Sequence, residues 1–152
     1  AFGLAKEQIS SLIIANRTGE KAKSLADDVS EHIPYVSTIE LTECHLKKAC
    51  ESINLIVNST SMGMRHSKTE QLTPLTAQII QPETLVCDMV YNPMETPLLM
   101  EARKAGARIL GGLPMLIYQG AAAFKHWIGK EAPIEVMFSS AQNALTNLFP
   151  DD

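Results

Sequence analysis

Three consecutive residues, Asn16, Arg17 and Thr18, place an amide, a cation and a hydroxyl directly after the apolar run Leu12–Ala15. A short apolar run that ends abruptly in polar residues indicates a buried strand, and the helix-forming residues that follow indicate a helix. Ligands bind at the carboxyl ends of strands in open parallel sheets. An arginine there can pair with a phosphate through two parallel hydrogen bonds, and the helix N-terminus offers further N–H donors.

The same position in an NAD-binding fold usually carries Asp or Glu, which holds the ribose 2′-hydroxyl. Replacing that acid with an amide, a cation and a hydroxyl favours the 2′-phosphate of NADP. The alternative is an exposed arginine beside a helix cap that binds nothing.

A second polar strand end occurs in NLIVNSTSMGM, residues 54 to 64. The apolar start runs directly into Asn58, Ser59, Thr60 and Ser61. Small polar side chains at such an end suit close contact with a ribose or a phosphate. The alternative is a loop whose side chains satisfy its own backbone.

Two further stretches carry polar groups after apolar runs. In VCDMVYNPMETPLL, residues 86 to 99, Asp88 is either a structural or a functional acid, and Tyr91 offers its hydroxyl to a substrate or is a core aromatic. In GGLPMLIYQGAAAFKHW, residues 111 to 127, helical spacing puts Met115 and Gln119 on one face, away from an apolar stripe that reaches Trp127 and Ile128. Met115 can lie against a flat ring, and Gln119 can donate and accept hydrogen bonds. The alternative is a glycine-permitted turn into an amphipathic helix, with Gln119 solvated.

The elements that position these groups alternate along the chain. Strands are predicted at 12–15, 35–39, 54–57, 84–88 and 108–110, and helices at 18–32, 42–52, 96–105, 114–128 and 134–149. Thr18, Thr42 and Thr96 are expected N-caps, and Gly106 is an expected C-terminal glycine. Apolar strands that alternate with helices predict an α/β, Rossmann-like, doubly wound parallel sheet with helices on both faces, followed by C-terminal helices.

Composition argues against several classes of protein. The 152 residues are 45% hydrophobic with a net charge of −4, which suits one ordinary domain and disfavours a nucleic-acid-binding face. No apolar stretch is long enough for a bilayer, and the N-terminus lacks a signal-peptide pattern. The three cysteines and four histidines lack metal-ligand spacing, which predicts reduced thiols in a cytoplasmic protein.

Together, NRT, VNSTSMGM, DMVYNPMETPLL and GGLPMLIYQGAAAFKHWIG resemble, in order, the C-terminal NADP-binding half of the shikimate and quinate/shikimate dehydrogenases. The resemblance spans essentially the whole chain, so residues 1–152 are expected to form one NADP-binding domain. It implies reduction of 3-dehydroshikimate to shikimate with NADPH in the shikimate pathway, which leads to aromatic amino acids.

The resemblance also implies roles for individual residues. Asn16, Arg17 and Thr18 with Lys21 would hold the 2′-phosphate. Tyr91 and Gln119 would reach the substrate. The cofactor groove and its nicotinamide end would be lined by Asn58, Ser59, Thr60, Ser61, Met89, Gly112 and Met115.

The sequence departs from the family pattern at two places. The glycine-rich loop with the first strand, and the substrate domain that carries the family's catalytic Lys and Asp, have no counterpart in these residues. We therefore expect a piece of a two-domain enzyme that is inactive alone, poorly stable or paired as a homodimer. Pro114 stands where the family commonly has glycine, so it has no amide N–H to offer a cofactor. The alternatives are an enzyme that uses NAD as well as NADP, a reductase of another substrate, and a non-catalytic nucleotide-binding module.

Overall fold

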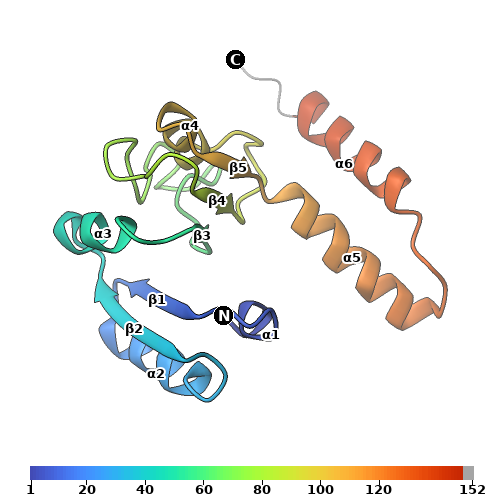
Figure 1. Cartoon of the computed structure of the whole chain (residues 1–152). Coiled ribbons are helices and arrows are strands. Elements are labelled where there is room, and N and C mark those ends of the chain that lie inside the picture. The colour runs from blue at the N-terminus through green and yellow to red at the C-terminus, as the bar shows by residue number, and fades with distance from the viewer. Residues whose placement is uncertain (149–152) are drawn as a thin grey trace. The chain divides into compact units, whose positions relative to one another are not determined.

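The computed structural model describes residues 1–148, which divide into two compact units, Ala1–Ile53 and a second that begins at Asn54 (Figure 1). The predicted end of the last helix, Phe149, lies outside the described residues. The expectation that all 152 residues form one NADP-binding domain remains a prediction.

The first unit is a two-stranded parallel sheet with helices beside it. Its elements are α1 (Phe2–Lys6), β1 (Ser11–Asn16), α2 (Gly19–Val29), β2 (Tyr35–Glu40) and α3 (Glu43–Cys50). The register pairs Ser11 with Tyr35 and Asn16 with Glu40. The helix α2 packs on both strands and buries Ala22 and Val29, which explains the helical spacing of its apolar residues.

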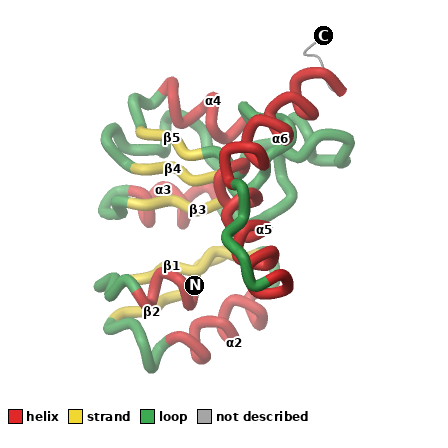
Figure 2. The backbone as a smooth tube through the Cα atoms, turned by 90° about the vertical axis from the view of Figure 1, so that its right-hand side faces the viewer, coloured by secondary structure: helices red, strands yellow, loops and turns green. Residues whose placement is uncertain are grey.

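The second unit is a three-stranded parallel sheet in the order β3-β4-β5, followed by two helices. Figure 2 shows the three strands side by side. Its elements are β3 (Leu55–Asn58), β4 (Leu85–Asp88), α4 (Pro97–Lys104), β5 (Arg108–Leu110), α5 (Leu113–Ile128) and α6 (Ile134–Leu148). The register pairs Asn58 with Asp88, so the polar ends of β3 and β4 lie at the same edge.

The parallel strands and the helices between them confirm the α/β, Rossmann-like class predicted from the sequence. Local signals located several helix ends correctly. The Thr42 and Thr96 hydroxyls accept the backbone N–H groups of His45 and Leu99, and Pro97 is the first residue of α4. Gly106 has φ of +77° after α4, a left-handed conformation that favours glycine.

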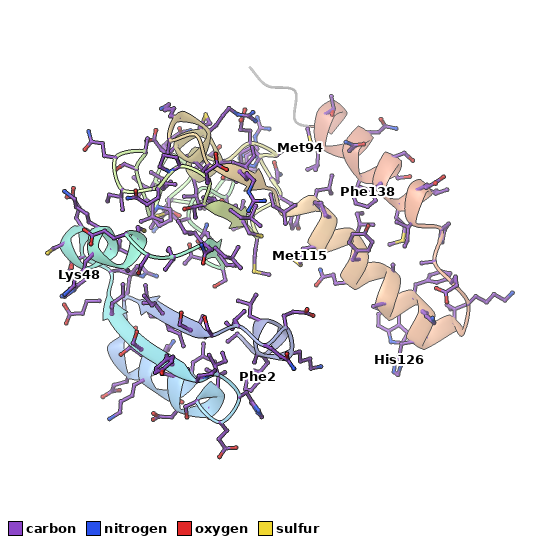
Figure 3. All side chains as sticks on the ribbon, in the orientation of Figure 1. Phe2, Lys48, Met94, Met115, His126 and Phe138 are labelled. Atoms are coloured by element: carbon purple, nitrogen blue, oxygen red, sulfur yellow. The ribbon has the colours of Figure 1, made fainter. Side chains whose placement is uncertain are left out.

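Thr18 is the N-cap residue of α2, as expected, although its side chain makes no capping hydrogen bond. One expectation for the helices was wrong. Trp127, expected in the core stripe of α5, is 78% exposed, and its neighbour Ile128 is exposed as well. The ring contact between Tyr118 of α5 and Phe138 of α6 lies more than two turns before Trp127, so α6 covers the middle of α5 (Figure 3).

Candidate functional site

The end of β1 forms an exposed turn that leads into α2. Asn16 closes the strand, and its side-chain Oδ1 accepts the backbone N–H of Thr18 at 3.0 Å. This bond fixes the turn that leads into α2, where Thr18 is the N-cap residue. Arg17 and Thr18 are both exposed beside it.

The side chains of this turn make a donor-rich surface, which we call the strand-end cluster: Asn16, Arg17, Thr18 and Lys21. Lys21 is exposed, and its backbone N–H reaches the Thr18 carbonyl at 3.1 Å, which holds it one turn along from Thr18. Two cations, a hydroxyl and a helix N-terminus together favour an anion. One acid, Glu20, stands in the same first turn of α2 and opposes that preference.

The second unit is organised around a carboxylate with no solvent exposure. Asp88 is 0% exposed at the end of β4. Its Oδ1 accepts the Asn58 amide Nδ2 at 3.0 Å and the Val90 backbone N–H at 3.0 Å, and its Oδ2 accepts the Thr96 hydroxyl at 2.6 Å. Asp88 therefore joins the end of β3, the loop after β4 and the start of α4. The sequence had left Asp88 between a structural and a functional role, and this geometry makes it structural.

Asn58 extends the same network into the loop after β3. Its Oδ1 accepts both the backbone N–H of Thr60, at 3.1 Å, and the Thr60 hydroxyl, at 2.7 Å. The Thr60 hydroxyl in turn accepts the backbone N–H of Met62 at 3.1 Å. Both ends of the Asn58 amide are thus used inside the protein, and Asn58 positions the loop from behind. The neighbouring Ser59 and Ser61 are exposed.

An open pocket of about 480 Å³ lies at this edge of the sheet. The sequence predicted five of its lining residues: Ser59, Thr60, Ser61, Met89 and Tyr91. It missed four others: Met64, Arg65, Val90 and Asn92. Arg65 directly follows the stretch 54–64, but no local sequence pattern assigns it to a pocket. The pocket brings the small hydroxyl side chains and Tyr91 together.

The start of α5 approaches the loop after β4 very closely. A Cβ added to Gly112 would lie 2.4 Å from the Met89 carbonyl oxygen and 2.8 Å from that of Val90. Glycine is therefore required at position 112 for packing between α5 and this loop. The other two predicted residues of α5 do not line the pocket: Met115 is half-buried and Gln119 is exposed.

Burial changes the acidity of two thiols. The pKa of Cys50 is raised by burial, and the pKa of Cys87 is raised by burial and then by the negative charge of Asp88. Cys44 is exposed, and all three cysteines are free. Among residues 1–148, no group of three His, Cys, Asp or Glu side chains is arranged to hold a metal ion. In the same range, no helix is long and apolar enough for a bilayer crossing.

Comparisons with known proteins agree with the resemblance found in the sequence. The model of the shikimate 5′-dehydrogenase C-terminal domain matches residues 112–137. The NADP(+) shikimate dehydrogenase of Moorella thermoacetica is 43% identical over 138 residues, which cover 90% of this chain and 46% of the relative. The chain thus spans about half the length of the curated relatives that it matches.

Solved structures show the same fold. Shikimate 5-dehydrogenase from Listeria monocytogenes, in complex with shikimate and NAD, matches with a TM-score of 0.83 and 27% identity over 92% of this chain and 50% of that one. The Thermus thermophilus enzyme, in complex with NADP(H) and shikimate, matches with a TM-score of 0.76 and 32% identity over 95% of this chain and 50% of that one. The chain therefore belongs to the shikimate dehydrogenase family and corresponds to about half the length of its members.

Proposed function

We propose that this chain is the NADP-binding part of a shikimate dehydrogenase that reduces 3-dehydroshikimate to shikimate with NADPH. The observation that carries the proposal is the exposed strand-end cluster, in which Arg17 and Thr18 stand where an NAD-selective fold places an acid. The names of the relatives, which are NADP(+) shikimate dehydrogenases, support it.

The donor set of the strand-end cluster fits the 2′-phosphate of NADP. Arg17 has the planar fork that pairs with two phosphate oxygens, and Lys21 supplies a second positive charge. The Thr18 hydroxyl is exposed and can donate to the ligand. The Asn16 side chain keeps the turn in place, because its Oδ1 already holds the Thr18 N–H.

The pocket of the second unit, taken by itself, offers groups that suit parts of a dinucleotide. Ser59 and Ser61 present hydroxyls to ribose or phosphate oxygens, while Thr60 and Asn58 hold the loop from within. Met89 is partly exposed in the pocket wall and offers an apolar surface for a flat ring. When bound, NADPH supplies the hydride; the residues of this chain orient it.

We assign the substrate side to Tyr91 and Gln119, with Met115 and Gly112 at the nicotinamide end. Tyr91 is 40% exposed in the pocket wall, so its hydroxyl is available to a ligand oxygen. Gln119 is exposed on α5 and can donate and accept hydrogen bonds. The three free cysteines accord with a reducing, cytoplasmic setting.

Use of NAD beside NADP is the second candidate. It is favoured by the Listeria monocytogenes structure, which was solved with NAD. Glu20 in the first turn of α2 also lowers the positive potential that a 2′-phosphate would meet.

Calorimetric titration of the 152-residue chain with NADPH and with NADH tests the proposal. We expect tighter binding of NADPH, and Arg17→Ala should weaken it about ten-fold, the equivalent of ~1.4 kcal/mol, because a charge-assisted pair is lost. NADH affinity should stay unchanged. Lys23→Ala, an exposed cation on the same helix, is the control. Equal affinities of the unsubstituted chain for the two cofactors would contradict the NADP assignment and favour the dual-cofactor candidate.

A further inference from the structure

Arg65 is the one charged side chain among the nine residues that line the pocket of the second unit. Its companions in the wall are hydroxyl, amide and apolar groups, and none of them is acidic. The Asp88 carboxylate behind the wall is fully buried and accepts three hydrogen bonds, so it faces Asn58, Val90 and Thr96. The pocket therefore combines one cation with several neutral donors.

The backbone around Arg65 is held in place from two sides. The Arg65 backbone N–H donates to the Asn92 carbonyl at 2.8 Å, which ties it to the loop that carries Tyr91. Two residues earlier, the Gly63 N–H donates to the Thr69 carbonyl at 2.9 Å. Gly63 has φ of +85°, and a Cβ there would lie 3.3 Å from Pro97 Cδ, so the turn favours glycine. These contacts fix where the arginine leaves the backbone.

We propose that Arg65 forms a second anion-binding subsite, in which its guanidinium binds an anionic oxygen pair of the ligand in this pocket. A planar guanidinium matches the geometry of a carboxylate or a phosphate, and partial burial strengthens the pairing relative to an exposed site. The hydroxyls of Ser59, Ser61 and Tyr91 line the same pocket and can donate to the remaining oxygens. This inference rests on the proposed function and extends it to a residue outside the strand-end cluster.

Two groups of the proposed ligands have this chemistry. One is the diphosphate that NADPH and NADH share, and the other is the carboxylate of shikimate. Arg17 differs from Arg65 in this respect, because a 2′-phosphate site affects NADPH alone. The ligand whose affinity depends on Arg65 therefore shows whether Arg65 binds the diphosphate or the carboxylate.

The test measures the affinities of NADPH, NADH and shikimate for the 152-residue chain and for Arg65→Ala, Arg65→Lys and Arg108→Ala. Arg108 is a matched control: it is an exposed arginine at the amino end of β5, whereas the pocket lies at the carboxyl ends of β3 and β4. All four proteins keep the backbone N–H that residue 65 donates to Asn92, and circular dichroism checks that each is folded.

We expect Arg65→Ala to weaken one ligand class about ten-fold, Arg65→Lys to weaken it less, and Arg108→Ala to change nothing. An equal loss for NADPH and NADH identifies the diphosphate, and a loss confined to shikimate identifies the carboxylate. If Arg65→Ala binds all three ligands with the same affinities as Arg108→Ala, the inference is overturned.

Inorganic diphosphate separates failure of this inference from failure of the proposed function. It is titrated into the Arg17→Ala protein, which lacks the strand-end arginine, and the amide NMR signals of residues 59–65 are followed. Shifts that disappear in Arg17→Ala/Arg65→Ala support the subsite even if the chain binds neither dinucleotide. Absence of these shifts in Arg17→Ala, together with a shikimate affinity that does not depend on Arg65, would overturn it, even if the NADPH preference of the unsubstituted chain stands.

Discussion

The strand-end cluster of the first unit and the pocket of the second unit both lie at the carboxyl ends of parallel strands, but different forces hold them. The cluster lies within six consecutive residues and is exposed except for the half-buried Asn16, whose side chain accepts the Thr18 N–H. The pocket is lined by two segments, 59–65 and 89–92, which the buried carboxylate of Asp88 joins through its hydrogen bonds to Asn58 and Val90.

This difference separates binding chemistry from structural support. In the strand-end cluster, the side chains that would touch a ligand belong to the turn itself and lie at the surface. Substitutions there should therefore change affinity and leave the fold intact. In the pocket, Ser59 and Ser61 would touch the ligand, while Asn58 and Asp88 place them without touching it. Substitutions of that second kind should act first on stability.

The largest expected effect is that of Asp88→Ala. It removes the acceptor for the Asn58 amide, the Thr96 hydroxyl and the Val90 N–H in a site with no solvent exposure, and each unsatisfied donor costs ~1–3 kcal/mol. We expect the free energy of unfolding, measured in urea, to fall by about 3 kcal/mol or more. Asp28→Ala, at an exposed position of α2, should stay within ~0.5 kcal/mol. An Asp88→Ala protein as stable as this control would show that the buried network does not hold the pocket together.

Gly112→Ala tests the close approach between α5 and the loop after β4. The added methyl would meet the Met89 carbonyl oxygen at 2.4 Å, and such overpacking costs ~1–3 kcal/mol. Gly111→Ala is the control, because its methyl would meet atoms only at an ordinary 3.6 Å or beyond. Urea unfolding of the two variants should separate them clearly, whereas equal stabilities would mean that α5 shifts without cost.

A smaller expected effect is a change in the pKa of the Cys87 thiol when its neighbour Asp88 loses its negative charge. Because burial and then the Asp88 charge raise the pKa of Cys87, less thiolate is present at a given pH, and the exposed Cys44 should be alkylated first. Asp88→Asn removes the charge and should lower the pKa of Cys87, so its alkylation begins at lower pH. Mass spectrometry across a pH series measures this shift.

Cys50 is the internal control for this experiment, since burial alone raises the pKa of its thiol. A parallel change at Cys50 in the Asp88→Asn protein would indicate general loosening of the structure instead of a local electrostatic effect.

The contrast between the two regions also explains what the sequence could predict. Thr96 and Pro97 were located correctly because a helix start depends on a few adjacent residues. The role of Asp88 stayed open because its partner Asn58 lies 30 residues away and becomes a neighbour only through strand pairing.

Arg65 was missed for a related reason: the turn at Gly63 and the bond to Asn92 bring it to the pocket, and neither is visible in a local pattern. Trp127 was assigned to the core wrongly because periodicity identifies an apolar face but not how far a partner helix covers it.

The most direct test of the central claim, that both regions bind NADP, is an amide NMR titration of the chain with NADP+ and with NAD+. We predict that NADP+ shifts the signals of Asn16–Lys21 together with those of Ser59–Ser61 and Met89–Tyr91. NAD+ should shift the pocket signals but leave those of Arg17 and Thr18 nearly unchanged, because it lacks the 2′-phosphate. Shifts confined to residues outside both regions, or identical shifts at Arg17 with the two cofactors, would contradict the account.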